Sequence, residues 1–118
     1  MNEEKFSQIK AAFEKNGGTF ESSPELDEYL AMRGADAITL NEKLIIFRYY
    51  PPPTASEVFE ELIHTAQFRN GRVATSSMAN LEIEAKEKLI KNQKQYGIPN
   101  HENEQTKRQL DELKRMLK

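Results

Sequence analysis

The chain of 118 residues is 37% hydrophobic and 31% charged, with 17 basic and 19 acidic side chains and no cysteine. This length suits one domain spanning residues 1–118, and the balanced charge lacks the basic excess typical of nucleic-acid binding. The absence of cysteine excludes disulfides and thiolate metal ligands, no apolar run could span a membrane, and the acidic start MNEEKFSQIK is unlike a secretory signal peptide. We therefore expect neither nucleic acid nor a membrane as a partner, and such a chain can work in the cytoplasm or be exported as part of a larger system.

Two helices are predicted near the start of the chain. Apolar residues recur at helical spacing over residues 3–16, and Gly17-Gly18 follows them as a C-terminal signal. The next tetrapeptide, TFES, is expected to be extended. Ser23-Pro24 is typical of a helix start, with serine as the cap and proline in the first turn, and predicts a second helix that runs to Gly34.

A β-hairpin and a central helix follow. The segments DAITL (36–40) and KLIIFRYY (43–50) are rich in β-branched and aromatic residues and flank the turn-prone pair Asn41-Glu42. The prolines at 51–53 end the second strand. Thr54-Ala-Ser-Glu57 fits a capping box, which predicts a helix over residues 55–69.

The last third is predicted to be helical. Asn70-Gly71 ends the central helix, and Ser76 or Ser77 can cap a long helix from Met78 to Tyr96-Gly97. Pro99 separates a final helix, whose apolar seam consists of Leu110, Leu113 and Leu117. The sequence thus predicts an α+β fold, mostly helical, with a small antiparallel sheet packed beside a central helix.

The central helix has two sides on a helical wheel of about 100° per residue. Its apolar side, expected to face the core, consists of Ala55, Val58, Phe59, Leu62 and Ala66. The opposite side carries Glu60, His64 and Gln67, with Ile63 at its edge and Glu61 on one flank.

Glu60 and His64 lie one turn apart on this polar side, and two ligands at positions i and i+4 can reach one metal ion. The same pair is also typical of a solvated helix face or a weak ion pair. His64 can equally be a partly buried core residue that hydrogen-bonds to a carbonyl group. Gln67 either orients a ligand or hydrogen-bonds to a neighbouring helix. EExxH alone leaves these alternatives open.

Two motifs occur in succession: EELIHTAQ at Glu60 to Gln67 and LEIEAKEKL at Leu81 to Leu89. Together they resemble the zincin metallopeptidases, in particular the short gluzincin-type domains with HExxHxxQ on one helix and ExxA or ExxAD on a following helix. The resemblance covers about residues 57–90. The predicted hairpin agrees with it, because zincins place an antiparallel edge strand beside the active-site helix to hold an extended peptide. The resemblance implies a zincin-like fold and metal-dependent hydrolysis.

The resemblance also implies roles for the matched residues. His64 matches the second metal-binding histidine, Glu61 the glutamate that activates water, and Glu82 the glutamate ligand of the ExxA element. Glu60 stands in place of the first histidine, and Lys86 stands where the ExxAD form has its aspartate. The expected site has Glu60, His64 and Glu82 as metal ligands and Glu61 as the catalytic base.

A helical wheel of the second motif helps to choose the third metal ligand. Glu82 lies nearer the apolar stripe of its helix than Glu84, so Glu82 is preferred and Glu84 is the alternative. A charged face that we expect to be exposed consists of Lys86, Glu87, Lys88 and Lys91. A Glu/His/Glu set would neutralise a divalent ion, and its oxygen ligands favour Mn²⁺ or Fe²⁺ while Zn²⁺ remains competitive.

We therefore predict a small metal-dependent hydrolase that acts on a peptide or protein substrate. Domains of this resemblance are often toxin or effector modules of bacterial or phage proteins. The alternative is a metal-free scaffold that serves as a protein-interaction domain through the hairpin edge or the apolar seam of the last helix. Without a metal, Glu60, Glu61 and Glu82 would form an uncompensated carboxylate cluster, which a protonated His64 would relieve in part.

Overall fold

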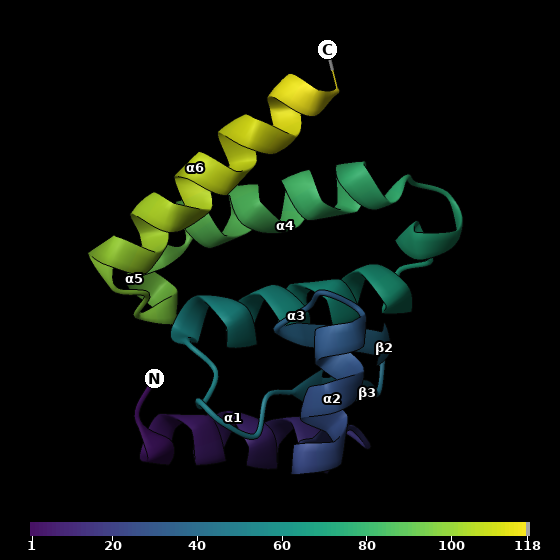
Figure 1. The fold of residues 1–118 in the computed structure, drawn as a ribbon, viewed down its shortest axis with the longest axis vertical. Coiled ribbons are helices and arrows are strands. Elements are labelled where there is room, and N and C mark those ends of the chain that lie inside the picture. The colour runs from purple at the N-terminus through teal and green to yellow at the C-terminus, as the bar shows by residue number, and fades with distance from the viewer. Residues whose placement is uncertain (118) are drawn as a thin grey trace.

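The structure, a computed structural model, describes residues 1–117. Six α-helices, three strands and one short 3-10 turn succeed one another in this range (Figure 1). In chain order they are α1 (Glu3–Lys15), β1 (Thr19–Glu21), α2 (Pro24–Met32), β2 (Ala37–Asn41), β3 (Leu44–Phe47), α3 (Ala55–Arg69), η1 (Arg72–Ala74), α4 (Met78–Lys91), α5 (Gln93–Tyr96) and α6 (Asn100–Met116). The predicted α+β class, mostly helical, is confirmed.

The three strands form one sheet in the order β1-β3-β2. The predicted hairpin is confirmed, because β2 and β3 pair antiparallel with Ala37 opposite Phe47. The extended TFES piece supplies β1, which pairs parallel with β3 and makes the sheet mixed rather than purely antiparallel. β2 is an edge strand, so its outer side has no strand partner among residues 1–117.

The second strand ends earlier than the sequence predicted. β3 stops at Phe47, so the prediction of strand for the last three residues of KLIIFRYY was wrong. Arg48 turns toward α3 and pairs with Glu57, at 2.8 Å, and with Asp36, at 3.0 Å. The backbone N–H of Tyr49 donates to the Asp27 carboxylate, at 2.7 Å, instead of to a strand. Side chains therefore take the hydrogen bonds that a longer β3 would have used.

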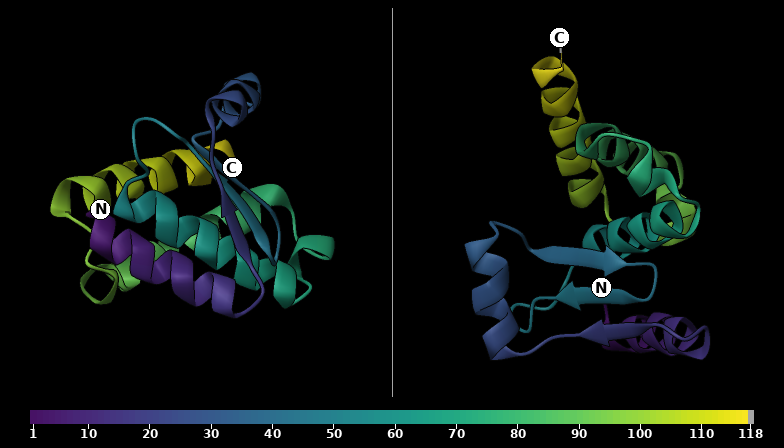
Figure 2. Two further views of the ribbon diagram at one scale, coloured as in Figure 1. Left: turned by 90° about the horizontal axis from the view of Figure 1, so that it is seen from below. Right: turned by 90° about the vertical axis from the view of Figure 1, so that its right-hand side faces the viewer.

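Helices α1 and α3 pack against the same face of the sheet, α1 beside β1 and α3 beside β2 (Figure 2). Ile45 and Phe47 are two residues apart on β3, so both side chains point to that face of the sheet. They pack with Phe20 and with Val58 of α3 in one hydrophobic cluster. The α1 residues that pack on this cluster are Phe6, Ile9 and Phe13.

A second hydrophobic cluster lies on the other side of α3. Ile63 meets Ala85 and Leu89 of α4, together with Ala55 and Ile98. Figure 1 shows the resulting stack, with α4 and α6 beyond α3 and the sheet and α1 on the other side. Helix α3 is thus the element that both halves of the molecule share.

The ends of α3 match the sequence prediction. Thr54 accepts from the backbone N–H of Glu57, and the Glu57 carboxylate accepts from that of Thr54, so the capping box is confirmed. Gly71 follows the helix with a φ of 72°, a left-handed conformation that glycine adopts without strain. The α6 residue Glu102 adds an unpredicted cap, accepting from the backbone N–H of Ser56 at 2.8 Å.

The predicted helix from Met78 to Tyr96-Gly97 is broken. α4 ends at Lys91, and the short α5 begins after Asn92. The Asn92 side chain donates to the Lys88 carbonyl oxygen at 2.9 Å, the kind of local contact by which asparagine competes with helix propagation. The break brings the ring of Tyr96 onto that of Phe59, with centroids 4.4 Å apart. No helix within residues 1–117 has both the length and the apolar character needed to cross a bilayer.

Candidate functional site

Three of the residues singled out in the sequence converge between α3 and α4. Glu60 and His64 project from adjacent turns of α3, and Glu82 projects from the second turn of α4. One side-chain ligand atom from each residue lies within 4.8 Å of the other two. The Nε2 atom of His64 is 3.2 Å from Oε1 of Glu82. The spacing in sequence and the packing of the two helices together make this cluster.

Gln67 fixes the orientation of the His64 ring. Its Oε1 lies 2.7 Å from Nδ1 of His64, while its Nε2 donates to the backbone oxygen of Leu81 at 3.0 Å. Gln67 is 2% exposed, so these contacts hold it inside the protein. With a proton on Nδ1 that is donated to Oε1 of Gln67, Nε2 is directed at Glu82, and Nε2 binds a cation only after it has lost its own proton. Both roles considered for Gln67 are thus combined in one side chain.

Glu61 is buried beside the cluster, although the sequence placed it on a flank of the helix. Its Oε1 accepts a hydrogen bond from the hydroxyl of Thr39 on β2, at 2.9 Å. Burial raises the pKa of Glu61 to about 7, because desolvation disfavours the carboxylate more than the charge of His64 and the Thr39 hydrogen bond favour it. A carboxyl group with this pKa can both accept and release a proton at neutral pH.

His64 and Glu82 form an ion pair that shifts the pKa values of both side chains. Burial opposes the imidazolium, but the hydrogen bonds to Glu82 and Gln67 and the charge of Glu61 outweigh burial and raise the pKa of His64 to about 9. The hydrogen bond from His64 holds the pKa of Glu82 below its usual range. In the metal-free protein at pH 7, His64 is therefore protonated and Glu82 ionised.

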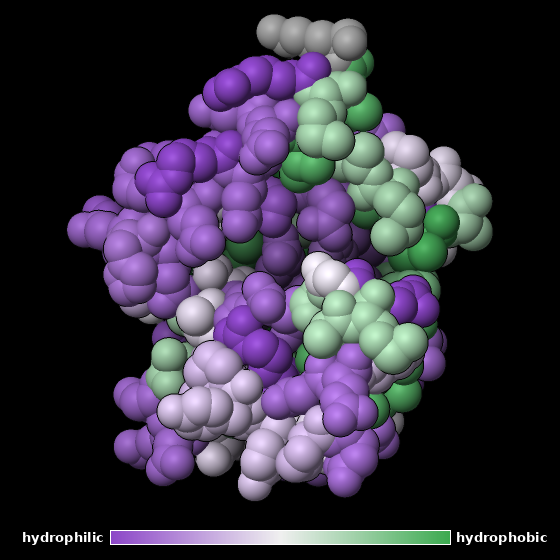
Figure 3. Space-filling model, viewed as in Figure 1, coloured by the Kyte–Doolittle hydropathy of each residue, from purple (hydrophilic) through white to green (hydrophobic). Residues whose placement is uncertain are grey.

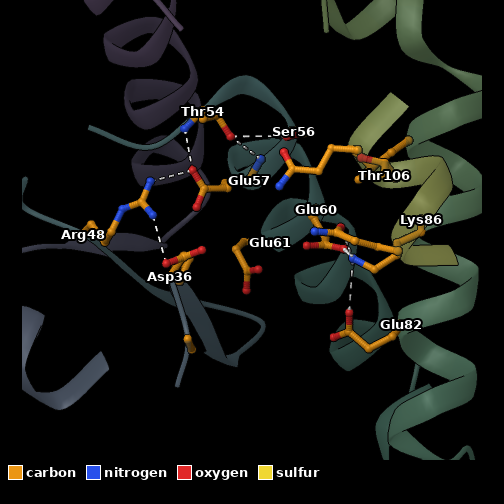
Figure 4. A pocket seen from close by; sticks show the side chains of 15 residues that line it. Asp36, Arg48, Thr54, Ser56, Glu57, Glu60, Glu61, Glu82, Lys86 and Thr106 are labelled. Atoms are coloured by element: carbon orange, nitrogen blue, oxygen red, sulfur yellow. Dashed lines mark hydrogen bonds and ion pairs between the residues drawn. The ribbon is translucent and has the colours of Figure 1, made fainter. Parts of the chain in front are cut away.

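Lys86 lies inside the cluster, so its predicted position on the exposed face was wrong. Its Nζ is 2.7 Å from Oε1 of Glu60 and 3.9 Å from Oε2 of Glu82, and it also contacts Gln109 of α6 at 3.2 Å (Figure 4). The residue is 9% exposed because α6 covers this side of α4. The i, i+4 spacing of Glu82 and Lys86 was the one sequence signal for this contact.

Glu84 points away from the cluster. One of its oxygens pairs with Arg72 Nη2 at 2.7 Å, and the other accepts from Gln67 at 3.2 Å. Of the two glutamates considered as third ligand, Glu82 is therefore the one that lies beside His64.

Two cavities meet at the cluster. One, of about 380 Å³, is polar and includes Glu60 and Lys86, and the other, of about 310 Å³, includes His64. Glu61 and Glu82 line both cavities. In Figure 3 the hollow lies between the part formed by α4 and α6 and the part formed by α2 and the sheet, with hydrophilic residues on its left side and hydrophobic residues on its right side. The candidate residues are thus accessible from a cleft rather than sealed in the core.

Comparison of the chain with protein-family models, with curated proteins and with solved structures finds no match. The resemblance to the zincins therefore rests on the two motifs and their spacing.

Proposed function

We propose that Glu60, His64 and Glu82 hold a divalent metal ion and that the protein is a metal-dependent hydrolase acting on peptide bonds. The observation that carries this proposal is the convergence of the three side chains beside the buried carboxyl group of Glu61. Two carboxylates and one imidazole suit Zn²⁺, Mn²⁺ or Fe²⁺ in their donor atoms.

The cluster already holds one cation, the ammonium of Lys86. Lys86 places a positive charge against Glu60 and near Glu82, so a cation is already stabilised at this position. The Nε2 of His64 faces the same position, and Gln67 holds the other ring nitrogen. A metal ligand histidine normally has such a partner for its second nitrogen.

The chemistry of the proposed reaction divides between the ion and Glu61. A divalent ion bound there would act as a Lewis acid that polarises a carbonyl group and makes water more acidic. Glu61 accepts the proton of the attacking water and returns it to the leaving amine. Its pKa is about 7 in the metal-free protein, and a divalent ion bound nearby would lower that pKa. Thr39 holds the Glu61 carboxyl group in place from β2.

The cleft supports an extended peptide as the substrate. The edge strand β2 supplies Ala37 to both cavities and Ile38 and Thr39 to the smaller one. An edge strand has backbone groups free to pair with an extended chain. Apolar residues of the smaller cavity that could receive an apolar side chain include Ile38, Phe68, Val73 and Leu81.

A metal-free interaction domain is the second candidate, and the Lys86 contact favours it. At pH 7 the ammonium of Lys86 and the imidazolium of His64 balance the carboxylates of Glu60 and Glu82. The carboxylate cluster that the sequence suggested would be uncompensated is therefore paired without a metal ion. The two candidates differ in metal content.

Elemental analysis of the purified protein and thermal unfolding with and without EDTA separate the candidates. The hydrolase proposal expects near-stoichiometric Zn, Mn or Fe, a melting temperature that falls on chelation, and cleavage of a denatured, fluorescently labelled protein substrate. Glu61→Gln should abolish cleavage and leave the metal bound, whereas Glu87→Gln, at an exposed position on α4, should retain cleavage. A folded protein that binds none of the three metals and does not respond to EDTA would refute the hydrolase proposal and favour the interaction domain.

A further inference from the structure

The ammonium of Lys86 contacts two of the three side chains that are proposed to hold the metal ion. Its Nζ is 2.7 Å from Glu60 Oε1, a charge-assisted hydrogen bond, and lies 3.9 Å from Glu82 Oε2. Glu60 and Glu82 are two of the three proposed metal ligands. Figure 4 shows the ammonium reaching between these two carboxylates from α4.

An ammonium in this position and a metal ion on the same carboxylate would repel each other. An ion coordinated by Oε1 of Glu60 would lie about 2.1 Å from that oxygen. An ammonium that stayed 2.7 Å from the same oxygen would then be separated from a divalent charge by less than about 5 Å. The repulsion would be strong, because the side chains of Lys86 and Glu60 are only 11% and 18% exposed.

Lys86 has room to leave. Its side chain and that of Gln109 both line the polar cavity of about 380 Å³, which is open to the cleft. The four-carbon stem of lysine is flexible, and the ammonium is well hydrated once it reaches water. The displacement therefore needs a rotation of one side chain and no movement of a helix.

We infer that Lys86 is a built-in cation that competes with the metal ion for Glu60 and Glu82, so that the site alternates between an ammonium-filled and a metal-filled state. This inference rests on the metal site proposed above and names its regulation. Lys86 sets the affinity for metal: the ion must displace a hydrogen-bonded ammonium from the carboxylates, instead of displacing water alone. In the metal-filled state the released ammonium lies in the polar cavity beside the substrate cleft.

Titration with Zn²⁺ and with Mn²⁺, followed by calorimetry, tests the inference on the full chain. Lys86→Met keeps a long flexible side chain and removes the charge. We expect it to bind the metal roughly tenfold more tightly or better, because the charge-assisted hydrogen bond from Lys86 to Glu60 no longer has to be broken. The double variant Lys86→Met/His64→Ala should lose this gain. Lys91→Met, which removes an exposed charge from the same helix, should bind as the unaltered protein does.

The outcomes separate the inference from the proposed function. Equal affinity in the unaltered protein and in a folded Lys86→Met variant would overturn the competition and leave the metal site standing. Absence of binding in both would overturn the metal site itself, and with it the inference. The expected pattern includes a further signature, since Lys86→Met in EDTA leaves Glu60 unpaired and should melt at a lower temperature that metal then restores.

A second measurement covers the case in which Lys86→Met does not fold. Nitrogen NMR of lysine ammonium groups in the unaltered protein reports directly on Lys86. Its hydrogen-bonded ammonium should give a resonance protected from exchange in EDTA, which disappears as Zn²⁺ saturates the site. Persistence of this resonance at saturating Zn²⁺ would overturn the inference.

Discussion

Thr39 and Glu61 are joined at both the backbone and the side chain of the glutamate. The Thr39 hydroxyl lies 3.0 Å from the carbonyl oxygen of Glu61 and 2.9 Å from its Oε1. One hydroxyl from the edge strand β2 thus ties the strand to α3 at the residue proposed as the catalytic base.

Thr39→Val tests this link, because valine has the same shape and no hydroxyl. Removal of the hydrogen bond should raise the pKa of Glu61 above about 7, since the bond favours the ionised form. The free energy of unfolding should fall by about 1–2 kcal/mol. We expect the acidic limb of the pH profile of hydrolysis to move to higher pH. Thr19→Val, at an exposed position on β1, is the control and should leave the profile unchanged.

Gln67→Leu should weaken metal binding although Gln67 is not a ligand. Leucine fills a similar volume but leaves His64 Nδ1 and the Leu81 carbonyl oxygen without their partner. We expect roughly a tenfold or greater loss of Zn²⁺ affinity and about 1–3 kcal/mol lower stability. Calorimetric titration and urea unfolding measure both. Gln8→Leu, at an exposed position on α1, serves as control, and an affinity for Zn²⁺ unchanged by Gln67→Leu would contradict the role assigned to Gln67.

The stability of the metal-free protein should fall as the pH rises from neutral to alkaline. The pKa of His64 is 6.5 in the unfolded reference and about 9 in the folded protein, where Glu82, Gln67 and Glu61 surround it. The ion pair therefore contributes its full stabilisation below pH 6.5 and loses it as the pH rises through about 9. We expect a decrease of about 1–3 kcal/mol over this window in EDTA. His64→Gln should flatten the profile there, and an equally steep fall in that variant would show that another group is responsible.

Protonation of Glu61 should make the stability depend on pH in a second, lower range of pH. Its pKa is raised from 4.5 to about 7, so the folded protein holds the proton more tightly than the unfolded chain does. Stability should be greatest below pH 4.5 as far as this group is concerned, and the contribution should be lost as the pH rises through about 7. Urea unfolding of Glu61→Gln against pH should lack this component. A difference between the two proteins that does not vary with pH would contradict it.

Glu102→Ala should destabilise α3 from a distance. The Glu102 carboxylate on α6 accepts from the Ser56 backbone N–H at 2.8 Å, at the positive end of the α3 dipole. We expect a loss of about 1–2 kcal/mol, measured by urea unfolding. Glu104→Ala removes an exposed glutamate that pairs with Lys107 and should cost less than about 0.5 kcal/mol. Similar losses in the two variants would show that the cap carries no particular weight.

Local signals in the sequence predicted the starts of α2 and α3 and the place of the hairpin, but not the ends of β3 and α4. The cap at Ser23, the capping box at Thr54 and the hairpin around Asn41-Glu42 depend on residues close together in the chain, and the structure contains all three, with Asn41 as the last residue of β2. The parallel pairing of β1 with β3 was missed, because it joins segments separated by the whole of α2. The residue types of TFES indicate an extended segment, but they do not indicate the strand with which this segment pairs.

The main error of the sequence prediction for the fold concerned which residues of the central helix are buried. The wheel assigned one buried side, yet Ile63, Thr65 and Gln67 are buried as well as Val58. A wheel assumes that one side of a helix faces water, whereas α3 lies between two hydrophobic clusters. The wheel of α3 therefore underestimated the burial of Glu61, whereas Lys86 is buried because α6 covers its side of α4.

The sandwiched position of α3 also has a mechanical consequence. Glu60 and His64 are on α3, and Glu82 and Lys86 are on α4. The imidazolium of His64 pairs with Glu82, and the ammonium of Lys86 pairs with Glu60, so each positive charge links α3 to α4. A metal ion bound to the same side chains would link the two helices in the same way. The charges on His64 and Lys86 therefore contribute to the packing of α3 on α4, in addition to the apolar contacts between these helices.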